Sequence, residues 1–240
     1  MWRESRVHVV VPAYREARLL PRMLGRVPAW VDRVIVVDDG SDDGTADVAE
    51  ACGDPRIDVV RHAVNRGVGA AIASGYERAF ALGADVAVVM AGDDQMHPDD
   101  LEAVVAPVAL GSADYVKGNR LVHPEARRMP AARRIAGRAL AFATRRVTGL
   151  AVGDTQCGYT ALAANAAAKL PLSELWPRYG YPNDLLGLLA GRGLTVHEVP
   201  VRPVYADEAS GIRPWHALTV LRVLVRRRRL ERQRRKITRD

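Results

Sequence analysis

The sequence predicts an α/β fold, with a mostly parallel sheet covered by helices on both faces. Short apolar, β-branched runs alternate with helical patterns through the first half of the chain. These runs are continuously apolar, as in strands that are buried on both faces, and do not alternate with polar residues. The 48% hydrophobic content of the 240 residues suits one full core. One domain with a C-terminal elaboration is the simplest division of the chain.

The expected elements follow one another in regular order in the first half. Strands are predicted over residues 7–12, 34–37, 57–60 and 86–90, with helices over residues 17–27, 45–51 and 70–82. The helix over 45–51 follows an Asp-rich turn, where Thr45 or a neighbouring Asp can cap it. Strands separated in this way by helices favour parallel pairing.

The second half is less regular. Strands are predicted over residues 115–118 and 195–201, and helices over residues 131–147, 181–192 and 214–236. The helix over 181–192 begins beside Pro182 and ends in a Gly-Arg-Gly sequence, which is typical helix punctuation. We therefore divide the chain into a main domain, residues 1–212, and a basic C-terminal helix or tail, residues 213–240.

The net charge of +7 is concentrated in that tail. Residues 222–240 hold ten Arg or Lys and two acidic residues, so the rest of the chain is close to neutral. A solvated end, an anionic membrane surface and a nucleic acid or other acidic partner all remain open for the tail. It lacks the interleaved aromatic residues of single-strand binders, and we expect no nucleic-acid function.

Other features of the composition bear on the compartment. The two cysteines, Cys52 and Cys157, have no spacing typical of a disulfide framework or zinc site, which fits a reducing compartment. The N-terminal residues contain no long apolar stretch of the signal-peptide kind. No window of about 18 apolar residues predicts a transmembrane helix. We expect a cytoplasmic protein.

Carboxylates follow the first, second and fourth predicted strands. They are Glu16, Asp38, Asp39, Asp93 and Asp94. The carboxyl ends of parallel strands share one edge, where open α/β sheets bind ligands. Clustered carboxylates repel one another unless a cation or hydrogen-bond donors occupy the site, and a nucleotide with its diphosphate-bound ion supplies both. The alternatives are a polar turn at residues 91–98 and an Asx-type turn at residues 38–41 that caps the next helix.

A glycine-containing segment, residues 65–71, opens the third helix. It is only loosely similar to a phosphate-binding glycine loop, and a lone match of this kind is weak. Asn65 and Arg66 could reach a bound donor molecule. Alternatively, Gly67 and Gly69 simply permit close packing of the helix.

Taken together and in order, the motifs carry a resemblance. They are Pro12-Ala13-Tyr14-Arg15-Glu16, Val37-Asp38-Asp39-Gly40-Ser41, residues 65–71, Gly92-Asp93-Asp94-Gln95, Gly118-Asn119-Arg120 and residues 154–159. Over residues 7–206 the chain resembles the family 2 glycosyltransferases, and within them it is most similar to the dolichyl- or polyprenyl-phosphate sugar synthases. The resemblance implies the GT-A fold, a Rossmann-like and mostly parallel sheet, here followed by C-terminal basic amphipathic helices.

The resemblance implies a nucleotide-sugar site at the strand ends. Its residues would be Pro12, Tyr14, Glu16, Asp38, Asp39, Asn65, Gly69, Gly92 and Asp93. Asp93 and Gln95 would hold a Mg²⁺ or Mn²⁺ ion. The family usually has an Asp where this chain has Ala91, so this chain has one acidic ligand fewer than the family pattern. Asp94 is a poor substitute, because adjacent residues on an extended segment point apart.

The catalytic residues implied by the resemblance are Arg120, Asp93, Asp184 and Asp154. Arg120 would meet phosphate, for which a guanidinium fork is better suited than a lysine. Residues 154–159 would line the acceptor side, with Asp184 as an acid nearby. From the residues alone, the alternatives are that Arg120 is a surface Arg and that Asp184 is a helix N-terminal acid. Cys157 is interpreted as a packed residue and not a nucleophile.

The function implied is an inverting transfer of a sugar from a UDP- or GDP-linked donor to a polyprenyl phosphate. A phosphate acceptor is already anionic, so it needs no strong general base, whereas a hydroxyl acceptor would need Asp184 or Asp154. Two alternatives remain: the same fold acting on a soluble hydroxyl acceptor, and a non-catalytic nucleotide-sugar binder with a basic partner-binding tail.

Two Arg-rich helical segments, residues 127–146 and 222–239, combine apolar and basic residues. An apolar face bordered by cations is typical of a helix that lies in the headgroup layer. We therefore expect a peripheral protein at the inner face of the membrane, with a separate membrane-embedded partner as a further expectation. The alternative is that both helices pack their apolar faces on the core.

Overall fold

A single mixed sheet organises the molecule. The computed structural model describes residues 1–204 and 215–237. The strands are β1 (Val7–Ala13), β2 (Arg33–Asp38), β3 (Ile57–Arg61), β4 (Val86–Val89), β5 (Tyr115–Asn119), β6 (Thr160–Ala163) and β7 (Val196–Pro200). Their order across the sheet is β3-β2-β1-β4-β6-β5-β7. Only β6 runs antiparallel to its neighbours among these described strands, which confirms the mostly parallel sheet.

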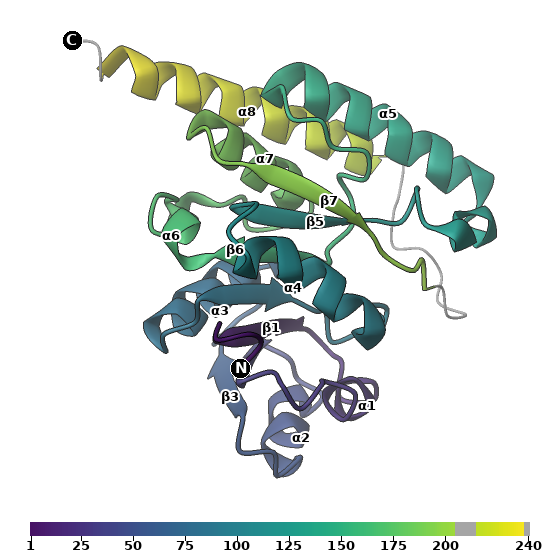
Figure 1. Cartoon of the computed structure of the whole chain (residues 1–240), viewed down its shortest axis with the longest axis vertical. Helices are drawn as coiled ribbons and strands as arrows, with labels where there is room; N and C mark the ends of the chain where they lie inside the picture. The colour runs from purple at the N-terminus through teal and green to yellow at the C-terminus, as the bar shows by residue number, and fades with distance from the viewer. Residues whose placement is uncertain (205–214, 238–240) are drawn as a thin grey trace.

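Helices cover both faces of this sheet, as predicted (Figure 1). Residues of α1 (Leu20–Leu24), α2 (Thr45–Ala51) and α4 (Leu101–Ala109) share one apolar cluster with Val9 and Val11 of β1. Residues of α3 (Val68–Ala81), α6 (Ala164–Ala167) and α7 (Tyr181–Gly191) share the other with Val10. Successive strand side chains point to opposite faces, so one run of valines supplies both cores. The described residues also form three short 3₁₀ helices: η1 (Pro98–Asp100), η2 (Pro124–Arg128) and η3 (Leu172–Glu174).

The first helix is shorter than predicted. Instead of spanning residues 17–27, α1 covers only Leu20–Leu24, because Pro21 fixes its first turn and the chain leaves the helix at Gly25. Strand β6, helices α4 and α6 and the 3₁₀ helices were not predicted. Strand β6 has four residues with little β-branched character, and α4 contains Pro107, which obscures the helical pattern.

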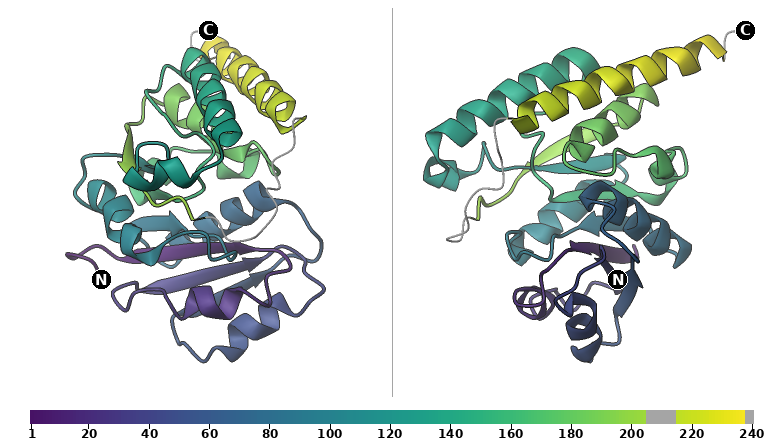
Figure 2. Two further views of the ribbon diagram at one scale, coloured as in Figure 1. Left: turned by 90° about the vertical axis from the view of Figure 1, so that its right-hand side faces the viewer. Right: turned by 180° about the vertical axis from the view of Figure 1, so that it is seen from behind.

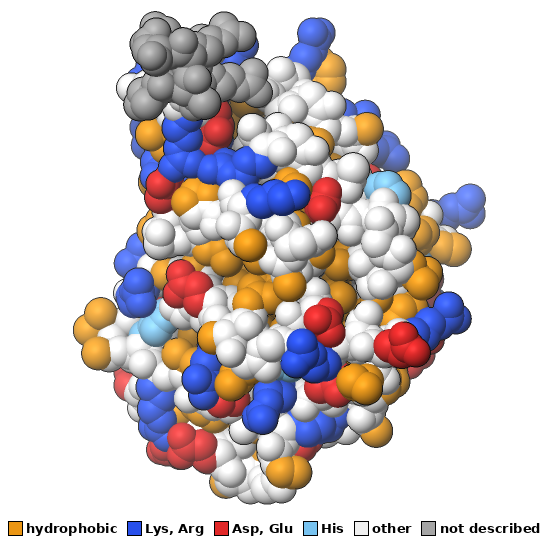
Figure 3. Space-filling view, turned by 60° about the vertical axis from the view of Figure 1, so that its left-hand side comes forward, with side chains coloured by type: hydrophobic (Ala, Val, Ile, Leu, Met, Phe, Trp, Pro, Cys, Tyr) orange, Lys and Arg blue, Asp and Glu red, His pale blue; other side chains and the backbone are white. Residues whose placement is uncertain are grey.

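The two Arg-rich segments form the long helices α5 (Ala131–Thr148) and α8 (Trp215–Ile237). They lie side by side in an outer layer and both contact α7 (Figures 1 and 2). Towards the end of the molecule that carries α8, basic side chains alternate with acidic ones on one face (Figure 3). Within residues 1–204 and 215–237, none of the helices combines the length and hydropathy needed to cross a bilayer. The expected domain boundary at 212/213 and the last tail residues, Arg239 included, lie outside the described residues.

Candidate functional site

A pocket of about 480 Å³ opens at the carboxyl edge of β1, β2 and β4. The ends of β1 and β2 are in register, with Ala13 paired to Asp38, so the polar residues that follow both strands come to the same edge. The predicted donor-site residues that line the pocket are Pro12, Tyr14, Glu16, Asp39, Asn65, Gly92 and Asp93. The edge of the sheet therefore brings together most of the predicted nucleotide-sugar site.

Asp39 is fixed in place by several hydrogen bonds. Its Oδ1 accepts from the Arg66 backbone N–H at 2.9 Å, and its Oδ2 accepts from that of Gly67 at 2.7 Å. The ring Nδ1 of His62 lies 2.7 Å from the same Oδ1. These bonds tie the end of β2 to the start of α3, and they hold a carboxylate rigidly at the pocket wall.

Its neighbour Asp38 has a different environment. The Asp38 side chain is buried and accepts a hydrogen bond from the Ser41 N–H at 3.0 Å. This is the Asx-type turn that the sequence left open as an alternative. Asp38 does not line the pocket, so the structure assigns it to the turn between β2 and α2.

The two acids after β4 point in different directions. Asp93 lines the pocket and accepts a hydrogen bond from the Gln95 N–H at 3.1 Å. Asp94 has a positive φ of 57° and turns towards α1 and the residues that follow it, where Arg22 Nε lies at 2.7 Å and Arg26 Nη1 at 2.8 Å from its oxygens. The two side chains point apart, as expected, but they do so at a turn and not along an extended segment, and Asp94 does not line the pocket.

The protein provides few ligands for a metal ion. Gln95 does not line the pocket, although Asp93 does. In the described part of the chain, no group of three or more His, Cys, Asp or Glu side chains is arranged to hold an ion. A hard cation bound through one carboxylate and the phosphates of a ligand fits this donor set, because Mg²⁺ commonly keeps few protein ligands.

The glycines at the start of α3 serve close packing. A Cβ on Gly69 would lie 2.1 Å from the carbonyl oxygen of Trp176, and a Cβ on Gly67 would lie 2.6 Å from that of Pro177. The Ala70 N–H donates to that Pro177 oxygen at 3.1 Å. Gly69 therefore does not line the pocket, contrary to its predicted role. The absence of a side chain at Gly69 leaves room for residues 176–179, which we call the pocket loop.

The pocket loop supplies two lining residues that were not predicted, Arg178 and Tyr179. The aromatic-rich sequence Trp176-Pro177-Arg178-Tyr179 before Gly180 was the available signal. The Tyr179 hydroxyl donates to Gln156 Oε1 at 3.0 Å, which joins the pocket to residues 154–159. Burial raises the pKa of this hydroxyl, and the nearby charge of Arg120 acts in the opposite direction.

Arg120 and Asp154 form a two-pronged ion pair. Arg120 Nε and Nη2 lie 2.7 and 3.0 Å from the two oxygens of Asp154, which is 1% exposed. Burial raises the pKa of the Asp154 carboxyl, but the charge and hydrogen bonds of Arg120, helped by Lys117, outweigh it and leave the pKa below its ordinary value. Asp154 is thus an ionised group that orients Arg120, and it is a poor proton acceptor.

A buried lysine supports the same region. Lys117 is fully buried in β5 and donates to the Cys157 carbonyl oxygen at 2.5 Å. Burial lowers the pKa of its ammonium group. A Lys inside an apolar strand was the available signal for this residue. Cys157 is itself buried, and burial raises the pKa of its thiol, which agrees with the predicted packing role.

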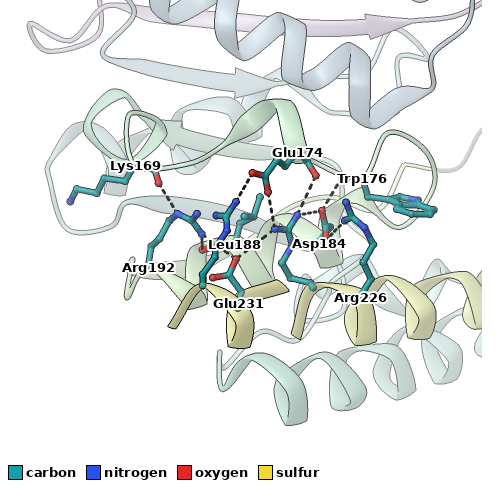
Figure 4. Close-up of polar contacts among 10 residues, drawn as sticks. Lys169, Glu174, Trp176, Asp184, Leu188, Arg192, Arg226 and Glu231 are labelled. Atoms are coloured by element: carbon teal, nitrogen blue, oxygen red, sulfur yellow. Dashed lines mark hydrogen bonds and ion pairs between the residues drawn. The ribbon is translucent and has the colours of Figure 1, made fainter. Parts of the chain in front are cut away.

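Asp184 lies away from the pocket lining. It is fully buried at the start of α7, where Arg227 of α8 contacts both of its oxygens (Figure 4). Its Oδ2 also accepts from the Trp176 N–H at 2.9 Å. A carboxylate enclosed and paired in this way does not meet an acceptor, so the structure corrects the predicted catalytic role.

The match to a family model decides the classification. The model described as glycosyl transferase family 2 matches residues 8–167. The chain belongs to this family. It is a glycosyltransferase, and the match spans β1 to β6, including every pocket-forming strand end.

Several relatives of this glycosyltransferase are similar over most of their length. The undecaprenyl-phosphate mannosyltransferase of Micrococcus luteus is 32% identical, over 82% of each chain. The polyprenol monophosphomannose synthase of Mycolicibacterium smegmatis is 32% identical, over 82% of this chain and 77% of its own. A UDP-N-acetylglucosamine–dolichyl-phosphate N-acetylglucosaminyltransferase of Methanococcus voltae is 29% identical, over 84% and 86%.

Solved structures confirm the GT-A fold of the glycosyltransferase. The glucosyl-3-phosphoglycerate synthase of Mycobacterium tuberculosis, in complex with UDP, superposes with a TM-score of 0.71. The match covers 94% of this chain and 80% of that one, at 23% identity. At this identity the similarity extends to the fold alone.

Proposed function

We propose that the protein is an inverting glycosyltransferase that moves a sugar from a UDP- or GDP-linked donor to a polyprenyl phosphate. The observation that carries the acceptor class is the state of the two candidate bases. Asp154 and Asp184 are both buried and both paired with arginines. A hydroxyl acceptor needs a base to remove its proton, whereas a phosphate does not. The relatives named for polyprenyl or dolichyl phosphate support the same assignment.

The pocket residues would bind the donor. Asp39, Asn65 and Tyr14 would hold the nucleoside at the ends of β1 and β2, and Asp93 would face the diphosphate. Mg²⁺ or Mn²⁺, held by Asp93 with Gln95 nearby, would offset the charge on the leaving diphosphate. The Mycobacterium tuberculosis synthase of the same fold has been solved with Mn²⁺ and UDP. Arg120, oriented by Asp154, would contact phosphate with its guanidinium fork.

A thermal-shift panel with a transfer assay tests this function. We expect one class of nucleotide sugar, UDP- or GDP-linked, to raise the melting temperature in the presence of Mn²⁺. Ligand at 100 times its dissociation constant stabilises a fold by about 2.7 kcal/mol. Transfer to a polyprenyl phosphate should follow with the same donor. Transfer to hydroxyl acceptors alone would contradict the lipid acceptor, and the absence of any nucleotide-sugar shift would contradict the donor site.

We further propose that the enzyme acts as a peripheral protein at the inner, cytoplasmic face of the membrane, assisted by a membrane-embedded partner. Helix α8 packs Val220, Val223 and Leu224 on the protein, as the alternative hypothesis held. The described part of α5 and α8 nevertheless exposes a second set of apolar residues: Ile135, Phe142, Leu218, Leu221 and Val225. Arg222, Arg228 and Arg229 are exposed on α8 as well. This mixture suits the headgroup layer, where a polyprenyl phosphate carries its reactive group.

Liposome flotation tests the membrane proposal. We expect the protein to float with anionic vesicles and not with neutral ones, and to dissociate at high salt, since each nearby basic residue contributes about 1 kcal/mol. Leu221→Ser with Val225→Ser should weaken binding, because both side chains lie on the exposed side of α8. Leu110→Ser, a change of an exposed apolar residue directly after α4, is the control. Equal recovery with neutral and anionic vesicles would contradict the proposal.

A further inference from the structure

Helix α8 places an arginine inside the protein. Arg227 is 1% exposed, and its Nε and Nη2 lie 2.8 and 2.6 Å from the two oxygens of Asp184, which is fully buried (Figure 4). Its Nη2 also donates to the Glu174 carbonyl oxygen at 3.3 Å. Burying both ions costs desolvation energy, which only close, two-pronged geometry offsets. The pair is therefore a specific docking contact between α8 and α7, quite unlike the exposed Arg228 and Arg229 beside it.

Small residues on α7 make room for this contact. A Cβ on Gly187 would lie 2.6 Å from Arg227 Cγ, and a Cβ on Gly191 would lie 2.6 Å from Glu231 Oε2. Glu231 Oε1 in turn lies 3.3 Å from Arg192 Nη1 and 3.6 Å from Arg227 Nη1. The surface of α7 is thus shaped to hold α8 in one register.

The contact continues from Asp184 to the pocket loop. Asp184 Oδ2 accepts a hydrogen bond from the Trp176 N–H at 2.9 Å, and the guanidinium of Arg226 lies over the Trp176 ring at 5.6 Å. Trp176 Nε1 donates to the Tyr179 carbonyl oxygen at 3.0 Å, so both ends of the loop are held. Tyr179 and Arg178 line the donor pocket. An unbroken chain of contacts therefore joins α8 to the pocket wall.

We propose that Arg227 is a positioning residue for donor binding. Through Asp184 it holds the pocket loop in place, so α8 supports the donor site although Arg227 does not line the pocket. The proposal rests on the proposed function, because it takes the ligand of this pocket to be the nucleotide of the donor. It assigns to the C-terminal helix a second task, separate from contact with a membrane surface. The ion pair is buried, so this task does not depend on lipid.

The test is a double substitution, Arg227→Met with Asp184→Leu. Replacing a buried ion pair by apolar residues of similar size often preserves stability, while it removes the acceptor of the Trp176 N–H. We expect faster amide hydrogen exchange at Trp176, Arg178 and Tyr179, a dissociation constant for the bound nucleotide (UDP or GDP, with Mn²⁺) about tenfold higher, and a larger change in donor KM than in kcat. The control Arg229→Met removes the same charge from the exposed side of α8, and it should match the wild type in amide exchange at the pocket loop and in nucleotide affinity.

Unchanged exchange at Trp176, Arg178 and Tyr179 and unchanged nucleotide affinity in the folded double variant would overturn the proposal. Should that variant not fold, Arg227→Lys keeps the charge but loses the fork. It should raise exchange in the pocket loop and raise the nucleotide dissociation constant about threefold, and wild-type values for both would overturn the proposal equally. Failure of the wild-type protein to bind either nucleotide would contradict the proposed function instead. In that case, amide exchange in the pocket loop would decide whether Arg227 holds this loop in place.

Discussion

Replacing Asp93 by alanine is expected to lower sugar transfer by about 10²–10³-fold, the scale for losing one electrostatic contact that stabilises a transition state. Asp93 is the carboxylate of the acidic turn that lines the donor pocket. Its loss removes the protein's main ligand for the cation proposed at the diphosphate. Steady-state kinetics over a Mn²⁺ titration measures the loss, and calorimetric titration of Mn²⁺ with the nucleotide measures ion binding without turnover.

The neighbouring acid provides a matched control. Asp94→Ala removes the same group one residue away, but Asp94 pairs with Arg22 and Arg26 outside the pocket. It should therefore lower the melting temperature while leaving turnover near the wild-type value. Ala91→Asp, which restores the usual family residue, should tighten ion binding or leave it unchanged. Near-wild-type turnover of Asp93→Ala at low metal, or weaker ion binding in Ala91→Asp, would show that the ion site is wrongly placed.

The second large effect is expected for Arg120→Lys, which should lower turnover by about two orders of magnitude. The change keeps the positive charge but removes the planar fork that holds both oxygens of Asp154 at 2.7 and 3.0 Å. The lysine cannot keep this pairing and also present a donor to a phosphate. Single-turnover kinetics with saturating donor separates the chemical step from binding.

Arg127→Lys serves as the control for this change, because Arg127 is exposed in η2 on the segment that follows Arg120. Melting temperatures of both variants exclude a loss of fold as the cause. If Arg120→Lys stayed within a few-fold of the wild type, Arg120 would have a structural role only.

Local patterns carried the prediction of the fold. Continuous valine runs separated by helical stretches specify buried parallel strands, and β2 and α2 begin and end within one residue of the predicted limits. The divergence of Asp93 and Asp94 was expected from an extended segment, but the structure produces it with a turn in which Asp94 has a φ of 57°. Residues 7–98 therefore contained enough information to place most of the donor pocket.

Features that depend on distant partners could not be predicted in this way. Gly69 looked like part of a phosphate loop, but its missing Cβ admits a carbonyl group more than 100 residues later in the chain. Arg178 and Tyr179 reach the pocket only because the pocket loop packs against the start of α3. No periodicity within either segment reveals the contact.

The sequence by itself determined the class of fold, the edge of the sheet where ligands bind, and the family, because strand ends and motif order are local properties. Only the tertiary structure decided which carboxylates are available for chemistry. Asp154 and Asp184 look alike as acids in a sequence, yet each is enclosed by an arginine 34 or 43 residues away. Whether a carboxylate accepts a proton, binds an ion or stabilises a helix depends on its burial and its partners, and both are set by packing between elements that are remote along the chain.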